Sequence, residues 1–355
     1  MPEPSSLDSP MKVSVVIPSH NNEATIGATV QSALAQQFAG GFEVIVVNDG
    51  STDGTRAALE QFGDRISVID QENRGVAAAR NAGIAAAAGE YIALLDGDDT
   101  WTEDKLEKSV QVLGRNPACV AAYSNAIEVD GAGREMSLYV PPECRHAPTL
   151  DEMLARPWPL IPSAIVMRRD TLLAIGGFRE EFGRRGYGGE DTFAFLLARE
   201  LGEIDFVPDN LARYRRSEFN ENLIKRRNSE GGNASAVDKL EDPRRLFDGH
   251  LVFVKLVRDR YSARGKALVR FSIDRMSGEL VGLGMMAMHR GDRALAHRCY
   301  RASIRYRPLW LKTYVRLGWA MLPGQLSKRI RPLLAPGIRR SLSGPPFSNL
   351  HDQPQ

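Results

Sequence analysis

Tyr91-Ile92-Ala93-Leu94-Leu95-Asp96-Gly97-Asp98-Asp99 is the stretch that decides the fold of this 355-residue chain. Its five consecutive apolar residues predict a strand that is buried on both faces, and such strands belong to parallel sheets covered by helices. The strand ends directly on three aspartates in residues 96–99, the acidic turn. In open sheets of this kind ligands bind beyond the carboxyl ends of the strands, so the acidic turn is a candidate site.

The carboxylates of the acidic turn repel one another unless a cation lies between them. A hard divalent metal ion, Mn or Mg, is held by oxygen ligands and shares itself with phosphate oxygens, so it suits this turn. Aspartates that merely cap the following helix would give the same pattern. The motif alone leaves both interpretations open.

Three further strand–helix units precede the acidic turn. Strands are predicted at 13–17, 43–47 and 66–69, and the helix after the first strand is expected to be capped by Asn22. Pro18 is expected to end the first strand, because proline cannot continue a central ladder. Repeated alternation of this kind predicts a right-handed parallel α/β sheet. Its carboxyl edge would gather a nucleotide-sized set of polar residues: Ser19, Asn22, Asp49, Asp53 and residues 96–99.

A dinucleotide-binding domain is disfavoured. It would need the pattern G-x-G-x-x-G after the first strand, where this chain has Pro18-Ser19-His20-Asn21-Asn22.

Four segments in order carry a resemblance to the family 2 glycosyltransferases of the GT-A fold. They are residues 13–23 (VSVVIPSHNNE), 47–55 (VNDGSTDGT), 73–83 (NRGVAAARNAG) and 95–99 (LDGDD). The resemblance covers about residues 11–220. It implies an α/β fold with a Rossmann-like, mostly parallel sheet flanked by helices. It also implies a nucleoside-diphosphate-sugar donor, with a UDP-sugar expected first, a divalent metal ion and inversion at the anomeric carbon.

The resemblance also implies roles for single residues. In the family, the aspartate matching Asp49 contacts the base, the loop matching 18–23 packs on the nucleoside, and the pair matching Asp96 and Asp98 holds ribose and metal. Arg80 has two open roles, contact with the ligand and bracing of its helix against the strand ends. We expect metal ligation by Asp98 and Asp96, and donor binding by Pro18, Ser19, Asn22, Glu23, Asp49, Asp53, Asn73, Arg80, Asp96, Arg215 and Arg216.

The acceptor half contains a Gly176-Gly177-Phe178 turn and then Glu190-Asp191 at the start of a predicted helix. Acidic residues at a helix start are favoured by the helix dipole, and alone they would indicate only a cap. A G-G-F turn before an E-D pair resembles the acceptor side of the family, in which the aspartate matching Asp191 is the general base. We therefore expect Asp191 and Glu190 to be catalytic. Trp158 is assigned to the core in preference to sugar stacking.

Charge is distributed unevenly along the chain. The formal net charge is +2, yet residues 256–345 hold 19 Lys and Arg against 4 Asp and Glu. This basic C-terminal part suits an anionic partner such as lipid headgroups or an anionic acceptor. A basic helical face that is merely solvated is the open alternative. No nucleic-acid partner is expected. Helical patterns after residue 240, including a hairpin over 291–322, predict a C-terminal α-helical extension.

The compartment is predicted from cysteines and apolar runs. The three cysteines are scattered and have no metal-ligand spacing, which favours a reducing compartment. Residues 1–10 lack the apolar region of a signal peptide. No apolar run reaches the roughly 18 residues that would cross a bilayer. We expect a cytoplasmic protein with a peripheral contact at the inner face of the membrane.

The predicted organisation has four parts. A disordered lead-in (1–10) precedes a glycosyltransferase domain (11–236), whose nucleotide half is about 11–115 and whose acceptor half is about 116–236. A basic helical extension (237–331) and a disordered tail (332–355) follow. The expected function is metal-dependent, inverting sugar transfer to a hydroxyl of a glycan or lipid-linked acceptor in bacterial polysaccharide biosynthesis. Two alternatives stay open: a sugar-nucleotide nucleotidyltransferase and a non-catalytic binding module.

Overall fold

A computed structural model of the chain describes residues 12–155, 158–185, 189–216, 252, 255–257, 259–261, 280–285, 287–288, 291–306 and 311–322. The chain divides into two compact units. The first comprises residues 1–184 and 189–216, and the second comprises residues 185–188 and 217–355. The predicted lead-in, the tail and the boundary near 236 lie outside the described residues.

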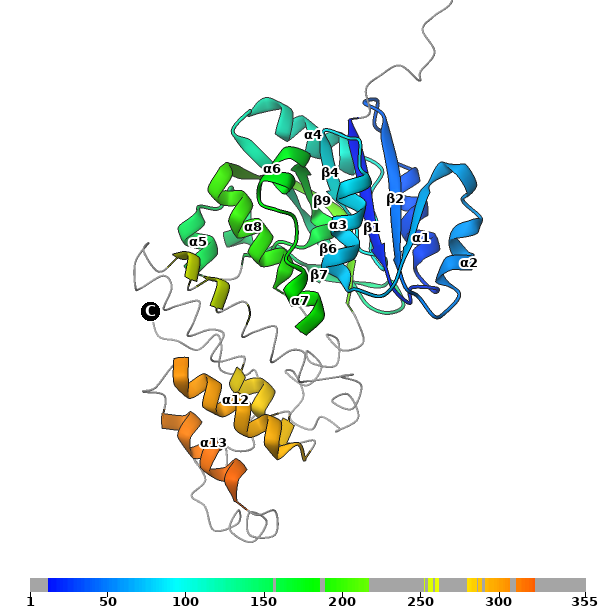
Figure 1. Ribbon diagram of the computed structural model, residues 1–355. Helices are drawn as coiled ribbons and strands as arrows, with labels where there is room; N and C mark the ends of the chain where they lie inside the picture. The colour runs from blue at the N-terminus through cyan, green and yellow to red at the C-terminus, as the bar shows by residue number, and fades with distance from the viewer. Residues whose placement is uncertain are drawn as a thin grey trace, which may run out of the picture. The chain divides into compact units, whose positions relative to one another are not determined.

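The first unit is built on a nine-stranded sheet with the order β3-β2-β1-β4-β8-β6-β9-β5, in which β7 pairs with β6 (Figure 1). The four strands predicted before the acidic turn are present and mutually parallel. They are β1 (Val13–Ser19), β2 (Phe42–Asp49), β3 (Ser67–Gln71) and β4 (Tyr91–Leu94). β1 and β4 are buried along their whole length, as continuous apolar strands require, whereas β3 at the edge of the sheet is partly exposed.

Helices cover both faces of this parallel part because the strands alternate their side chains. Ile26 and Val30 of α1 (Ile26–Leu34) pack in one core cluster with Val13 and Val15 of β1. Val16 points to the other face, where α3 (Val76–Ala86) lies against it. The connecting helix after β2 is α2 (Thr55–Glu60), and η1 (Gly63–Arg65) leads into β3.

The remaining strands make the sheet mixed rather than parallel throughout. β8 runs antiparallel to β4 and to β6, β6 is parallel to β9, and β5 is antiparallel to β9. Hydrophobic periodicity identifies such strands but does not specify their direction or partner. These strands are β5 (Thr100–Trp101), β6 (Cys119–Val129), β7 (Glu135–Leu138), β8 (Ile165–Arg168) and β9 (Glu203–Arg215).

Short helices connect the mixed part of the sheet. α4 (Lys105–Arg115) packs on β6 and β9 through its apolar face. The others are η2 (Pro142–Cys144), α5 (Leu150–Ala155), η3 (Pro162–Ala164), α6 (Arg169–Ala174), α7 (Glu180–Arg185) and α8 (Glu190–Leu201).

Two local expectations about the first strand and helix are wrong. β1 continues through Pro18 to Ser19, because its ladder with β4 ends at Val16, so the missing N–H of Pro18 leaves no bond unmade on that side. α1 begins at Ile26, and Asn22 does not cap it with its side chain. Instead the backbone carbonyl of Asn22 accepts hydrogen bonds from the N–H groups of Thr25 and Ile26, both at 2.9 Å.

The second unit contains the predicted helical extension. Its helical hairpin consists of α12 (Arg293–Tyr306) and α13 (Leu311–Met321), which pack against each other and against residues 280–285 and 287–288. Their shared core includes Leu283, Leu295 and Tyr300. In the described parts of the chain no helix combines the length and apolar content needed to cross a membrane.

A pair of helical glycines tests how closely α3 packs on β1. A Cβ at Gly83 would lie 2.4 Å from Cγ1 of Val16, whereas a Cβ at Gly114 of α4 would meet nothing within 4 Å. Gly83→Ala should therefore destabilise the protein by about 1–3 kcal/mol through overpacking. Gly114→Ala, the matched control, should stabilise it by about 0.5–1 kcal/mol through helix propensity. Urea unfolding measures both, and equal effects would contradict the packing of α3.

Candidate active site

The acidic turn lies at the carboxyl edge of the sheet, in contact with the start of α1. The hydroxyls of Thr25 and Thr29 donate hydrogen bonds to the carbonyl of Gly97 at 2.9 and 3.1 Å. A Cβ at Gly97 would come within 2.8 Å of Oδ1 of Asn22, so only glycine allows this approach. The predicted nucleoside loop, residues 18–23, is thus brought to the turn that follows β4.

Asp49 is buried and its carboxylate is engaged on both oxygens. Oδ1 accepts hydrogen bonds from Nε2 of Gln71 at 2.6 Å and from the N–H of Arg74 at 2.9 Å. Oδ2 accepts from the N–H of Gly75 at 2.8 Å. Asp49 therefore fixes the segment between β3 and α3. Its contact with a base stays a prediction.

The other predicted donor residues after β1 and β2 hold these two loops together. The N–H of Glu23 donates to Asp53 at 3.1 Å, and the N–H of Gly54 donates in return to Glu23 at 3.0 Å. The hydroxyl of Ser19 donates to Asn22 at 3.1 Å. Nδ2 of Asn73 lies 3.1 Å from Nε2 of His20, which brings the segment after β3 to the same place. With Pro18 at the end of β1, the structure gathers this predicted set at one edge.

Arg80 joins the acidic turn to the Glu190-Asp191 pair. Its side chain is only 3% exposed. Nη2 donates to Oδ1 of Asp96 at 2.8 Å, and Nη1 donates to Oε1 of Glu190 at 2.9 Å. The guanidinium also lies 5.3 Å from the ring centroid of Phe178 in the G-G-F turn. Of the two roles left open for Arg80, bracing is therefore present.

Asn81, the next residue of α3, holds the G-G-F turn itself. Its amide donates to the carbonyl of Phe178 and accepts from the N–H of the same residue, both at 2.8 Å. Gly177 has φ of 68°, and a Cβ there would lie 2.5 Å from Oδ1 of Asn81. The turn needs glycine for both reasons. α3 thus organises the acceptor side as well as the donor side.

Asp191 is half-buried at the start of α8, where Gly189 precedes the helix with φ of 101°. One oxygen accepts a hydrogen bond from the N–H of Thr192 at 2.5 Å. Burial, and then the charge of Glu190, raise the pKa of Asp191 to about 7, although Arg80 acts in the opposite direction. A carboxylate that titrates near neutral pH can accept a proton from a hydroxyl group.

Asp98 is the carboxylate of the acidic turn with the chemistry of a metal ligand. Burial and the nearby charge of Asp96 raise the pKa of Asp98 to about 6. The charge of Arg215 acts in the opposite direction. Within the described ranges, no three His, Cys, Asp or Glu side chains come together as a group that could hold a metal ion. Mg²⁺ sites commonly use one or two carboxylates plus substrate phosphates, and Asp98 with Asp96 fits that smaller set.

Arg215 and Arg216, two of the predicted donor-binding residues, are engaged with protein groups. Arg215 donates from Nε to the carbonyl of Asp98 at 3.2 Å and from Nη1 to the carbonyl of Gly131 at 2.8 Å. Arg216 forms an ion pair with Glu128 of β6, with Nε 2.9 Å from Oε1. Arg215 is therefore brought to the acidic turn. Donor binding by both arginines stays a prediction.

Sequence reasoning missed two tyrosines near these carboxylates. The rings of Tyr139 and Tyr214 meet edge to face, with centroids 5.3 Å apart. Burial raises the pKa of both, and the charge that adds most is that of Asp191 for Tyr139. For Tyr214, Tyr139 adds most to the rise in pKa after burial, followed by the charge of Asp99. Tyr139 lies in a stretch without periodicity, which offered no signal. Trp158, by contrast, is buried in the core as expected.

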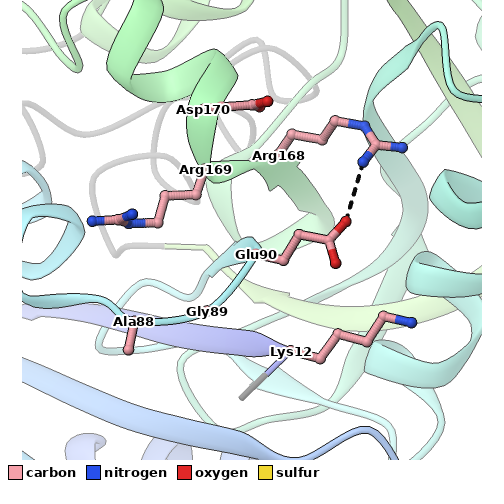
Figure 2. A pocket seen from close by; sticks show the side chains of 7 residues that line it. All are labelled: Lys12, Ala88, Gly89, Glu90, Arg168, Arg169 and Asp170. Atoms are coloured by element: carbon pink, nitrogen blue, oxygen red, sulfur yellow. Dashed lines mark hydrogen bonds and ion pairs between the residues drawn. The ribbon is translucent and has the colours of Figure 1, made fainter. Parts of the chain in front are cut away.

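A pocket of about 570 Å³ lies at the other end of the parallel strands, where β1 and β4 begin (Figure 2). Arg168 is held there by Glu90 at 3.3 Å and by the carbonyl of Cys119 at 2.9 Å. Arg169 points away from this pair in Figure 2. Because its charged side chains do not converge, the pocket offers no second site comparable to the carboxyl edge. Its lining residues are Lys12, Ala88, Gly89, Glu90, Arg168, Arg169 and Asp170.

The chain is similar to known proteins in sequence and in fold. The profile of glycosyl transferase family 2 matches residues 14–172. Glycosyltransferase GlyG of Streptococcus pneumoniae is 32% identical over 219 residues, which are 58% of this chain and 70% of that protein. The Escherichia coli protein WfgD, named UDP-Glc:alpha-D-GlcNAc-diphosphoundecaprenol beta-1,3-glucosyltransferase, is 41% identical over 106 residues, or 29% of this chain and 42% of WfgD.

A solved structure shows the same fold. The crystal structure of S. aureus TarS 1–349 in complex with UDP aligns with a TM-score of 0.50 at 20% identity, over 84% of this chain and 92% of TarS 1–349. The GT-A fold expected from the sequence is therefore confirmed. The chain spans 42% of the length of WfgD, and 65% and 53% of the lengths of two other curated relatives.

Removal of the Arg80 charge should be far more damaging than removal of an exposed arginine. Arg80→Met leaves Glu190, whose side chain is 8% exposed, and Asp96 without their shared cation. We expect a loss of about 3 kcal/mol or more in the free energy of unfolding. Arg56→Met breaks a surface pair with Asp70 and should change it by less than about 1 kcal/mol. Urea unfolding compares the two variants. Similar small losses would mean that Arg80 does not join the two carboxylates.

Proposed function

This chain belongs to glycosyl transferase family 2, and from that premise we propose that it transfers a sugar from a nucleoside diphosphate to a hydroxyl group, with inversion at the anomeric carbon. The observation that carries the proposal is the Arg80 bridge, in which one guanidinium contacts both Asp96 and Glu190. Through this bridge the residues proposed for donor binding and those proposed for catalysis belong to one site.

The donor lies along the carboxyl edge of β1, β2 and β4 in this proposal. The nucleoside packs on the loop of residues 18–23, and the diphosphate points toward the acidic turn. The name of the E. coli relative WfgD gives UDP-glucose as its donor and a lipid diphosphate-linked sugar as its acceptor. This supports a UDP-sugar and a glycan or lipid-linked acceptor here, in the synthesis of a bacterial polysaccharide.

Asp98 and Asp96 would hold Mn²⁺ or Mg²⁺ together with phosphate oxygens of the donor. Such an ion, when bound, neutralises the charge that grows on the departing diphosphate. One oxygen of Asp96 is occupied by Arg80, which leaves Oδ2 available to share the ion. Burial and the like charge of Asp96 raise the pKa of Asp98 to about 6. Such a rise is expected when no cation lies between two neighbouring carboxylates.

Asp191 takes the acceptor proton. As the acceptor oxygen forms its bond to the anomeric carbon, the bond from that carbon to the diphosphate oxygen breaks, and the diphosphate keeps the electron pair. The proton of the hydroxyl passes to the carboxylate of Asp191. Attack from the side opposite to the leaving group inverts the configuration, and no covalent intermediate on the protein is needed. Glu190, held by Arg80, orients the start of α8.

The main test compares Asp191→Asn and Asp98→Asn in release of UDP from UDP-glucose and UDP-GlcNAc with Mn²⁺. Asp191→Asn should lower kcat by about 10²–10⁴-fold and leave the donor Kd nearly unchanged. Asp98→Asn should raise the donor Kd in Mn²⁺. In the wild type, kcat should rise with pH through about 7 as Asp191 loses its proton, and Asp191→Asn should remove that dependence.

The matched control is Asp151→Asn, an exposed aspartate in the first turn of α5. It should leave kcat and Kd unchanged. Normal turnover by Asp191→Asn would show that the base is assigned wrongly. A pyrophosphate exchange reaction in place of UDP release would indicate a nucleotidyltransferase, and wild-type binding of UDP-sugars without turnover would indicate a binding module.

We also propose that the second unit contacts an anionic membrane surface. Residues 293–322 contain no Asp or Glu. Arg298, Arg301 and Arg305 recur at helical spacing on the exposed face of α12. In α13, Met321 is 66% exposed, and Tyr314 is 44% exposed. A basic face together with exposed apolar side chains is the pattern of helices that lie in a membrane interface.

Sedimentation with vesicles tests this contact. The protein should bind phosphatidylglycerol vesicles more tightly than phosphatidylcholine vesicles, and salt should weaken the binding because it screens the charges. Reversal of Arg298, Arg301 and Arg305 to glutamate should abolish the preference, whereas Arg65→Glu with Arg115→Glu on the first unit should not. Equal binding by both variants would contradict the proposed contact.

A further inference from the structure

Ser163 lies behind the acidic turn and touches both of its ends. It is fully buried in η3, between the segment that contains Trp158 and β8. Its hydroxyl donates to Oδ2 of Asp99 at 2.5 Å and accepts from the N–H of Asp96 at 3.0 Å. One side chain from a distant part of the sequence therefore closes the turn. Its own carbonyl is in turn held by Nε1 of Trp101 at 2.6 Å.

Asp99 extends this contact to the end of β9. It is 1% exposed, and its Oδ1 accepts a hydrogen bond from the N–H of Arg215 at 2.7 Å. Its own N–H donates to the carbonyl of Asp96 at 3.1 Å, which fixes the shape of the turn. Nε of Arg215 reaches the carbonyl of Asp98. The backbone of the turn is thus restrained at Asp96, Asp98 and Asp99.

These restraints act on the backbone of the turn and on Asp99, and they leave the Asp98 carboxylate outside the network. A buried aspartate directed away from the ligand side would be costly unless it were fully hydrogen-bonded, and Asp99 has a partner on each oxygen. The three aspartates of the turn therefore have different roles. Asp98 is half-buried and its carboxylate lies outside this network, Asp96 is shared with Arg80, and Asp99 holds the turn in place.

We propose that Ser163 and Asp99 are positioning residues that hold Asp96 and Asp98 in the geometry needed to share a divalent cation. The inference rests on the proposed function for the cation, but the restraint itself is a property of the fold. Residues that orient metal ligands from behind typically change metal affinity by about 10–100-fold when they are mutated. Ser163 should act through Asp96 and Asp99 without touching donor or cation.

Ser163→Ala should release the turn, and Ser109→Ala is its matched control. Ser109 is equally buried, in α4, and its hydroxyl makes no hydrogen bond within the described structure. Amide hydrogen exchange measured by NMR gives a readout that does not depend on function. The Asp96 amide should exchange faster in Ser163→Ala than in the wild type, whereas in Ser109→Ala its exchange rate should not change. The amides of β4 should stay protected in both variants. Unchanged exchange at Asp96 would overturn the restraint.

Binding of Mn²⁺ alone, followed by electron paramagnetic resonance, gives the second readout. Ser163→Ala should raise the Kd for Mn²⁺ about 10-fold or more, and Ser109→Ala should not. A general loss of stability would lower Tm without changing the Kd of the protein that remains folded, so an unchanged Kd in Ser163→Ala overturns the positioning role.

Two conservative variants separate the hydroxyl from the volume of the side chain. Ser163→Thr keeps the hydroxyl and should restore the Kd to within about twofold of wild type. Ser163→Cys keeps the size but hydrogen-bonds weakly, so it should give an intermediate Kd even if Ser163→Ala fails to fold. A wild type that binds no Mn²⁺ would refute the proposed metal assignment, and with it the purpose given to Ser163, while the exchange result would still decide the restraint.

Discussion

The buried guanidinium of Arg80 is the interaction on which the arrangement of the site depends. A charge removed from water needs partners, and Arg80 has two, one from the acidic turn and one from the start of α8. Because all three groups are on different elements, α3, the end of β4 and α8 must keep fixed positions relative to one another. The glycine at position 83 lets α3 approach β1 closely enough to place this charge.

Around this bridge, similar side chains acquire different properties from their surroundings. Burial and a like charge raise the pKa of Asp98 to about 6, and burial with Glu190 raises that of Asp191 to about 7. Asp49 instead accepts three hydrogen bonds, two of them from backbone N–H groups, and so holds the segment between β3 and α3. In the proposed mechanism, the first environment would suit a cation and the second a proton acceptor, while the third holds the segment between β3 and α3. Carboxylates of one chemical type thus take separate roles.

Local sequence was sufficient for the parallel half of the fold and for the family. Apolar runs such as 91–95 and the polar residues after them follow from burial and strand ends, which are local properties. The antiparallel placement of β8 between β4 and β6 depends on long-range pairing, which no periodicity encodes. Likewise, the bond between Arg80 and Glu190 and the bond between Ser163 and Asp99 join residues more than 60 positions apart. Arg215 shows the limit clearly, because its bonds to the carbonyls of Asp98 and Gly131 join segments that are far apart in the sequence.

A double-mutant cycle tests the central claim most directly. Asp96→Asn and Glu190→Gln are combined in metal-free protein, and the free energy of unfolding is measured for the single and double variants. If both carboxylates share Arg80, each single variant removes one of its two ion-pair partners, and the double variant removes both. The account predicts that the double variant loses more stability than the sum of the single losses, by roughly 0.5–3 kcal/mol. Strict additivity would contradict it.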